Sequence, residues 1–224
     1  MKHSVLVRSV VSVALISASA FAHANGTHEQ FVDPAASLSF DGWNELNRNR
    51  TGGALTVEEL VAGSGSNVAG SGDAVFTRVS GDHYPAGFGL YGGASTFTFT
   101  DTTVDAGATA LVFQGIINDF DGQFGGTPFS LTLSYNGGSQ AIAGTLVDSA
   151  LNGGVSDYFR YTWDLSALGT PVGAYTLTLN AGFSQMLAFQ IDQVAAVPEP
   201  ETYALMLSGL GLIALSVRRR MRGV

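Results

Sequence analysis

The sequence predicts an all-β protein, an antiparallel β-sandwich or jelly roll, over its central part. Short runs alternate between polar and apolar residues, which is the pattern of strands with one buried face. Asn-Gly and Gly-Gly pairs separate these runs and favour tight turns. Only 12% of the 224 residues are charged, and 29 are Gly. An average soluble protein is about a quarter charged. Many short strands at this spacing favour two packed sheets over a helical bundle.

Nine segments are predicted strands. The runs 95–100, 129–135 and 174–179 alternate most regularly between polar and apolar residues. The run 111–117 is apolar on both faces, which predicts a central strand. The other predicted strands are 35–40 and 75–79, both at sheet edges, and 140–147, 157–163 and 186–194.

The turns between these strands predict some of their pairing. Asn136-Gly137 lies between two alternating runs and favours a two-residue hairpin turn. The segments 129–135 and 139–147 are therefore expected to pair. Helix is scarce: 56–61 predicts one or two turns, and 164–169 predicts a turn that ends at a C-cap glycine.

The first 24 residues have the pattern of a secretory signal peptide. Lys2 and Arg8 precede a mainly apolar run from 10 to 22, which is short for a membrane span. The run ends in Ala22-His23-Ala24, a small-residue cleavage site, and cleavage after Ala22 is the competing position. Either site predicts export through the Sec translocon, so that residues 25–196 fold outside the cytoplasm.

The last 28 residues, 197–224, have three parts. Pro198-Glu199-Pro200 is an extended segment, because two prolines fix φ and remove backbone donors. The run 203–217 is apolar and predicts a single hydrophobic helix, about 22 Å long at 1.5 Å per residue. A basic cluster then closes the chain and is expected to stay on the cytoplasmic side of the membrane. This cluster consists of Arg218, Arg219, Arg220 and Arg222.

Together, these terminal elements resemble the PEP-CTERM sorting signal of Gram-negative bacteria. Glu201 and Tyr203 depart from its commonest form, in which Ser or Thr and Trp are usual. The resemblance implies export, transient anchoring in the inner membrane and processing by an exosortase near Pro198-Glu199-Pro200. It also implies a bacterium that makes exopolysaccharide and biofilm matrix. A permanent C-terminal anchor is the alternative.

Charge and composition exclude several chemistries for the central domain. The chain has no Cys, which excludes disulfides, thiolate metal sites and cysteine nucleophiles. Residues 25–197 contain four Arg, no Lys and 16 acidic residues, a formal charge of −12. The missing lysine excludes a P-loop and a Schiff base. The negative charge argues against nucleic acid as a partner.

Two kinds of acidic site are candidates. Asp119, Asp121 and Gln123 have the i, i+2, i+4 spacing that calcium loops use, and hard cations prefer such oxygen ligands. A solvated acidic turn is the alternative for these residues. A glycan hydrolase would need two carboxylates as acid and base, for which Asp119 with Asp121 or Asp157 with Asp164 are available.

The aromatic residues suggest a binding surface. Trp43 lies between Gly42 and Asn44 in a polar segment, so we expect it to be an exposed platform for sugar rings. Trp163 ends an alternating run and is expected to be buried. His83 follows Gly81-Asp82 in a predicted turn and is expected to lie on the surface.

These features predict an exported protein of the cell surface or extracellular matrix. Its expected role is structural or adhesive in an exopolysaccharide or biofilm matrix, without enzymatic activity and without a cofactor. A carbohydrate-binding module, with a possible structural calcium ion, is the alternative, and a glycan hydrolase is the third reading. The expected partners are the Sec translocon, the exosortase, the inner membrane and exopolysaccharide.

Overall fold

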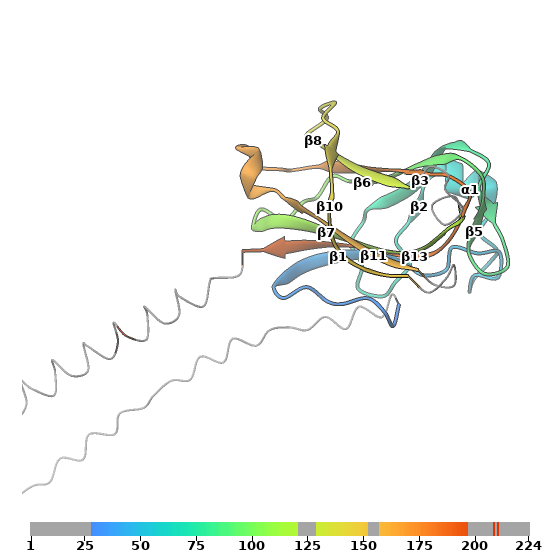
Figure 1. Ribbon diagram of the computed structural model, residues 1–224, viewed down its shortest axis with the longest axis horizontal. Helices are drawn as coiled ribbons and strands as arrows, with labels where there is room; N and C mark the ends of the chain where they lie inside the picture. The colour runs from blue at the N-terminus through green and yellow to red at the C-terminus, as the bar shows by residue number, and fades with distance from the viewer. Residues whose placement is uncertain (1–27, 121–128, 152–156, 197–207, 209, 211–224) are drawn as a thin grey trace, which may run out of the picture.

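The computed structural model describes residues 28–120, 129–151 and 157–196, together with 208 and 210. This part of the chain is mostly β-structure in two antiparallel sheets, with one short α-helix and one short 3-10 helix. Figure 1 shows the two sheets nearly edge-on, with β6 and β8 above β11 and β13. The predicted all-β class is confirmed for the described residues.

Sheet A has seven strands in the order β10-β11-β7-β13-β5-β4, and β1 also pairs with β13. β7 lies between β11 and β13, which confirms that 111–117 is central. The other side of β13 pairs first with β5 and then with β1. The strands are β1 (Ser37–Trp43), β4 (Tyr84–Pro85), β5 (Leu90–Gly92), β7 (Ala108–Asp119), β10 (Thr145–Ala150), β11 (Tyr158–Asp164) and β13 (Ser184–Ala195).

Sheet B has six strands in the order β2-β3-β6-β12-β8-β9. In β6 and β12 every second residue is buried, as the alternating sequence predicts. The buried residues pair across the two strands, with Leu177 opposite Phe99 and Leu179 opposite Phe97. The strands are β2 (Ser64–Gly65), β3 (Val75–Gly81), β6 (Ser95–Asp101), β8 (Ser130–Tyr135), β9 (Ile142–Ala143) and β12 (Tyr175–Ala181).

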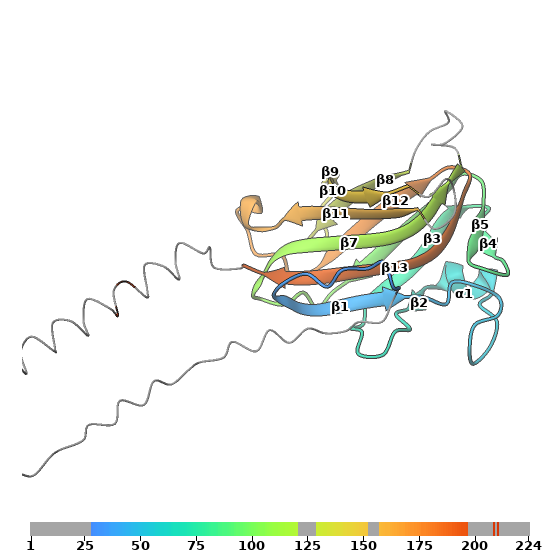
Figure 2. The ribbon, with the colours of Figure 1, turned by 60° about the horizontal axis from the view of Figure 1, so that its bottom comes forward.

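One hydrophobic core lies between the sheets. Phe76 of β3 and Phe99 of β6 both contact Phe189 of β13, with ring centroids 5.3 and 5.1 Å apart. Phe99 also contacts Phe113 of β7 at 5.6 Å. All four rings are fully buried. The inner faces of the two sheets therefore pack against each other, and Figure 2 shows the strands of sheet A in front of those of sheet B.

The predicted hairpin after β8 forms, but it is shorter than expected. β8 pairs with β9 at only two positions, and the chain then crosses to sheet A, where β10 pairs with β11. The crossing is at Gly144, where a Cβ atom would lie 2.7 Å from the Trp163 ring. The prediction of one strand over 140–147 is therefore wrong, because the chain passes this ring and changes sheets.

Both short helices form where the sequence predicts helical turns, at 56–61 and 164–169, with bounds that differ by one or two residues. Helix α1 (Val57–Ala62) begins after Thr56, whose Oγ1 accepts a hydrogen bond from Glu59 N at 3.1 Å. Such a side-chain cap satisfies one of the free amides of the first turn. The 3-10 helix η1 (Ser166–Leu168) ends at Gly169, which has a left-handed φ of 71°.

The N-terminal segment 28–36 covers part of the outer face of sheet A. Val32 N donates to Gln114 Oε1 at 2.8 Å, and Gln114 Nε2 donates back to Val32 O at 3.0 Å. The Phe31 ring packs on Tyr158, with centroids 6.2 Å apart. Both faces of β7 are therefore buried, which explains why its sequence is apolar without alternation.

The predicted terminal segments lie outside the described residues. Residues 1–24 are not described, and of 197–224 only Ser208 and Leu210 are described, both in helical conformation. Among the described residues, no helix combines the length and the apolar character needed to span a membrane. β13 ends at Ala195, at the left in Figure 1, so the sorting segment follows directly from the last strand.

Candidate functional site

The residues predicted to direct sorting belong to the undescribed ends of the chain. They are Ala22 and Ala24 at the predicted signal cleavage site, Pro198, Glu199 and Pro200, and the basic residues Arg218, Arg219, Arg220 and Arg222. Because the structure does not describe these residues, their roles are addressed by comparison with known families and by mutation. The described domain holds the candidates for binding.

The prediction that Trp43 is an exposed platform is wrong. Its side chain is only 1% exposed, and its Nε1 donates to Ser64 O at 3.2 Å. The ring packs on Phe99 and Phe76, with centroids 5.3 and 6.1 Å apart. Trp43 is thus a core residue that joins β1 to sheet B, and it cannot stack on a sugar.

The predicted calcium loop is described only at Asp119, since Asp121 and Gln123 lie outside the described residues. Asp119 is buried, and its Oδ2 accepts a hydrogen bond from Phe129 N at 3.1 Å. This contact ties the end of β7 to the start of β8. Within the described ranges, no group of three His, Cys, Asp or Glu side chains could hold a metal ion.

His83 is buried, which corrects the expectation of a surface residue. Its Nδ1 lies 2.8 Å from Ser95 Oγ of sheet B, and its Nε2 lies 3.0 Å from Ser184 Oγ of sheet A. Burial lowers the pKa of His83 to about 4, although nearby Asp82 acts in the opposite direction. A neutral imidazole therefore joins the two sheets near pH 7.

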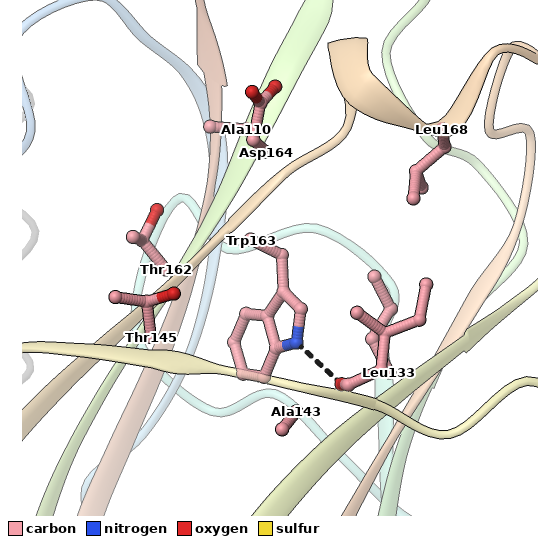
Figure 3. Close-up of a pocket in the computed structure, with 9 residues that line it drawn as sticks. Ala110, Leu133, Ala143, Thr145, Thr162, Trp163, Asp164 and Leu168 are labelled. Atoms are coloured by element: carbon pink, nitrogen blue, oxygen red, sulfur yellow. Dashed lines mark hydrogen bonds between the residues drawn. The ribbon is translucent and has the colours of Figure 1, made fainter.

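A pocket of about 260 Å³ opens beside Trp163, between β9, β10, β11 and η1. Figure 3 shows the indole among the residues that line the pocket, with its Nε1 donating to Ile142 O at 2.9 Å. Trp163 is 3% exposed, which confirms its predicted burial. The lining is mainly apolar, with Thr145, Thr162 and Asp164 as its polar members.

The acidic chemistry of this pocket is limited. Its one carboxylate, Asp164, accepts hydrogen bonds from Ser166 N at 2.9 Å and Ser166 Oγ at 2.5 Å. These bonds lower the pKa of Asp164 and favour the ionised form. A glycosidase acid needs a raised pKa and a second carboxylate across the sugar. Asp157, the suggested partner, is not among the residues that line this pocket.

Two aspartates within sheet A are buried instead. Asp192 of β13 accepts hydrogen bonds from Ser37 Oγ at 3.0 Å and Gln190 Nε2 at 2.9 Å. Burial raises the pKa of Asp192 to about 6. Asp41 of β1 accepts from Ala74 N at 3.1 Å, and burial raises its pKa to about 6 as well. The Asp192 carboxyl joins β13 to β1, and the Asp41 carboxyl joins β1 to the segment before β3. Neither lines the pocket beside Trp163.

Exposed aromatic rings gather at the end of sheet A that carries β4 and β5. Tyr84 and Phe183 are 47% and 39% exposed, and Tyr91 and Phe120 lie half-buried between them. We call these four residues the aromatic end. The sequence offers Tyr84 and Tyr91 as aromatics that could stack on sugar rings if exposed, but it does not group the four residues, because they come from three separate segments. The pairing of β7 with β13 brings Phe120 and Phe183 together, and Phe120 N donates to Phe183 O at 3.0 Å.

Comparison with known proteins bears on the C-terminal segment. Residues 196–220 match the family model of the PEP-CTERM protein-sorting motif. No curated protein matches the chain. The match confirms the resemblance inferred from the prolines, the apolar run and the basic cluster. The chain thus carries a signal that marks an exosortase-dependent sorted protein.

Proposed function

We propose that this protein is exported, released by an exosortase and retained at the cell surface or in the extracellular matrix. There its β domain acts as a structural or adhesive component of an exopolysaccharide matrix, without catalytic activity. The observation that carries the proposal is the PEP-CTERM match at residues 196–220, directly after the last strand of the domain. The predicted signal peptide at 1–24 provides the export that this sorting requires.

A jelly roll is the proposed form of the domain. Taken in chain order, β1, β6, β7, β8, β9, β11, β12 and β13 form nested pairs. The first strand pairs with the last, the second with the seventh, the third with the sixth and the fourth with the fifth. Such nesting is what a long hairpin gives when it rolls into two sheets. The added strands β3 and β10 extend one edge of each sheet.

A passive role is supported by the state of the acidic groups. Asp41, Asp119 and Asp192 accept hydrogen bonds from the protein and are buried. The pocket beside Trp163 holds one carboxylate, Asp164, and hydrogen bonds from Ser166 lower its pKa and favour its ionised form. Acid–base hydrolysis of a glycan needs two positioned carboxyls, so a matrix protein fits these groups better than a hydrolase does.

The sorting role predicts that Pro198→Ala/Pro200→Ala blocks release. Loss of both prolines removes the fixed extended backbone beside Glu199. The variant should remain in the inner-membrane fraction with its C-terminal segment uncleaved, whereas the wild-type chain is processed and released. Cell fractionation and the mass of the mature C-terminus measure this outcome.

Pro171→Ala is the matched control, because this proline is exposed in the domain, far along the chain from the motif. It should be released normally. Normal release of the double variant would contradict exosortase processing at these prolines. Retention of the wild-type chain in the membrane with an intact C-terminus would instead indicate a permanent anchor.

A further inference from the structure

The rings of the aromatic end form one connected group. Tyr91 contacts Tyr84, Phe183 and Phe120, with centroids 6.3, 5.3 and 6.4 Å apart. Phe120 and Phe183 are 5.1 Å apart. A connected and partly exposed group of rings on a soluble domain commonly marks a binding surface. Phe88, 83% exposed in the β4–β5 turn, adds a further ring to the same end of the sheet.

Polar groups continue the same row across sheet A. Tyr84 lies opposite Tyr91, Tyr91 opposite Gln185, and Gln185 opposite Asn118. Gln185 Oε1 accepts from Asn118 Nδ2 at 3.1 Å. In the described part of the chain, the Gln185 amide nitrogen and the two tyrosine hydroxyls have no hydrogen-bond partner. The row therefore offers apolar ring surface next to free hydrogen-bonding groups, which is the combination that a sugar ring requires.

The row is fixed in place by the backbone beneath it. A Cβ atom at Gly89 would lie 2.2 Å from Met186 O, and one at Gly92 would lie 2.5 Å from His83 Cα. The β4–β5 hairpin therefore packs directly on β13 and on the chain before β4. His83, which precedes Tyr84, is held by serines of both sheets. A surface ordered in advance loses little conformational entropy on binding.

The aromatic end lies at the opposite end of β13 from the sorting segment. β13 runs from Ser184 beside the rings to Ala195 before the motif, about 36 Å at 3.3 Å per residue. Figures 1 and 2 both show β5 at the right, while β13 ends at the left. A domain tethered through its C-terminus thus presents these rings away from the tether, which favours an extracellular occupant over a membrane surface.

The negative charge of the domain favours an uncharged polymer over an anionic one as the extracellular ligand. Residues 25–197 carry a formal charge of −12 and no lysine. One arginine lies beside the aromatic end, since Arg78 donates a hydrogen bond to His83 O next to Tyr84, but the domain as a whole remains strongly negative. An anionic polymer would be repelled by this domain unless cations bridged the two. An uncharged polysaccharide meets no such repulsion and offers apolar ring faces with hydroxyl groups.

We propose that the aromatic end is a binding site for an uncharged polysaccharide, with Tyr84 and Phe183 as the exposed stacking rings and Gln185 as a hydrogen-bond donor. This inference rests on the proposed matrix function and names the ligand class of that function. In this proposal the exposed rings of the aromatic end, and not the buried Trp43, contact the sugar.

Native affinity electrophoresis of the full chain in mild detergent tests this site. Hydroxyethylcellulose and galactomannan in the gel should slow the wild-type protein, and alginate, an anionic polymer, should not. Tyr84→Ala/Phe183→Ala should weaken binding to the neutral polymers about tenfold or more, because both exposed rings are lost. Gln185→Ala should weaken binding less.

Val79→Ala/Leu151→Ala is the matched control, since it removes two exposed apolar side chains elsewhere on the domain. It should bind like the wild-type chain. Absence of retardation by both neutral polymers, or unchanged binding by the ring variant, would overturn the proposal. The proposal would also be overturned if the ring variant differed from the wild-type chain only in its sedimentation and not in polysaccharide binding. That result would assign the rings to a contact between copies of the chain. Release of the wild-type chain from the membrane is measured in a separate experiment. It tests the proposed sorting and does not depend on whether the aromatic end binds polysaccharide.

Discussion

Trp43→Ala should destabilise the domain by about 3–5 kcal/mol, the usual range for removing a large buried aromatic side chain. The ring is 1% exposed and contacts Phe76 and Phe99 of sheet B. Its loss leaves a cavity between β1 and sheet B and leaves Ser64 O without its indole donor. Urea unfolding followed by circular dichroism would measure the change in the free energy of unfolding.

Phe88→Ala is the control for this substitution, because Phe88 is aromatic but 83% exposed. It should change the unfolding free energy by no more than about 0.5 kcal/mol, as surface substitutions usually do. If Trp43→Ala kept wild-type stability and lost only polysaccharide binding, Trp43 would be the ligand platform after all, and the core assignment would be refuted.

The mistaken prediction for Trp43 has a long-range physical cause. Its neighbours in sequence are small and polar, so the local pattern gives no sign of burial. The ring is covered by Phe76 and Phe99 of sheet B, which come much later in the chain. The segment that follows β2 also binds the backbone beside Trp43. Asn67 N and Val68 N both donate to Gly42 O, and Ser71 Oγ accepts from Gly42 N. Periodicity within one strand cannot reveal such a cover.

Local sequence patterns predicted the strands and helices reliably, but they did not predict the tertiary environment of individual residues. The alternation in β6 and β12 requires only that one sheet face be buried, and the structure agrees residue by residue. The helical turns predicted for 56–61 are equally local, and in the structure Thr56 caps them. The predictions for His83 and for one strand over 140–147 were wrong, because both environments depend on parts of the fold far away in the sequence. His83 contacts Ser95 and Ser184 of the two sheets, and Gly144 lies against the Trp163 ring.

The candidate functional residues differ in the same way between the sorting segment and the aromatic end. The sorting segment could be predicted because its signal lies within about 25 consecutive residues, and the family model matches that span. The aromatic end could not, because Tyr91, Phe120 and Phe183 are brought together only by the pairing of β13 with β5 and β7. A linear motif is visible in one sequence, whereas a surface assembled from several strands is not.

The second large effect is a pH-dependent stabilisation by Asp192→Asn. Burial raises the pKa of Asp192 from 3.8 to about 6 in the folded chain. At pH 8 the folded protein must hold this carboxylate ionised. The difference between 3.8 and about 6 corresponds to about 3 kcal/mol at 1.36 kcal/mol per pKa unit. The variant removes that cost and should be more stable than the wild-type chain by up to about this amount.

The sign follows from proton binding. Between pH 6 and 3.8 the folded state binds the Asp192 proton more tightly than the unfolded state does, so acidification stabilises the wild-type chain at this group. That contribution is complete below about pH 3.8 and is lost as the pH rises through about 6. The difference between the variant and the wild-type chain should therefore shrink on acidification and vanish near pH 4. Asp41 and His83 also have shifted pKa values, but they are present in both proteins, so their effects cancel in the comparison.

The neighbours of Asp192 can form hydrogen bonds with the side-chain amide that Asp192→Asn introduces. Among the described residues, Gln190 Oε1 is buried without a hydrogen-bond partner. Rotation of the Gln190 amide would turn this oxygen towards the new donor at position 192. Ser37 Oγ can still donate to the remaining oxygen. Urea unfolding at pH 8, 6 and 4 measures the effect, with Asp148→Asn on the exposed strand β10 as the control for net charge. A variant that is less stable than the wild-type chain at pH 8, or a difference that does not change with pH, would show that the ionised carboxylate is needed to hold the hydrogen bonds from Ser37 and Gln190.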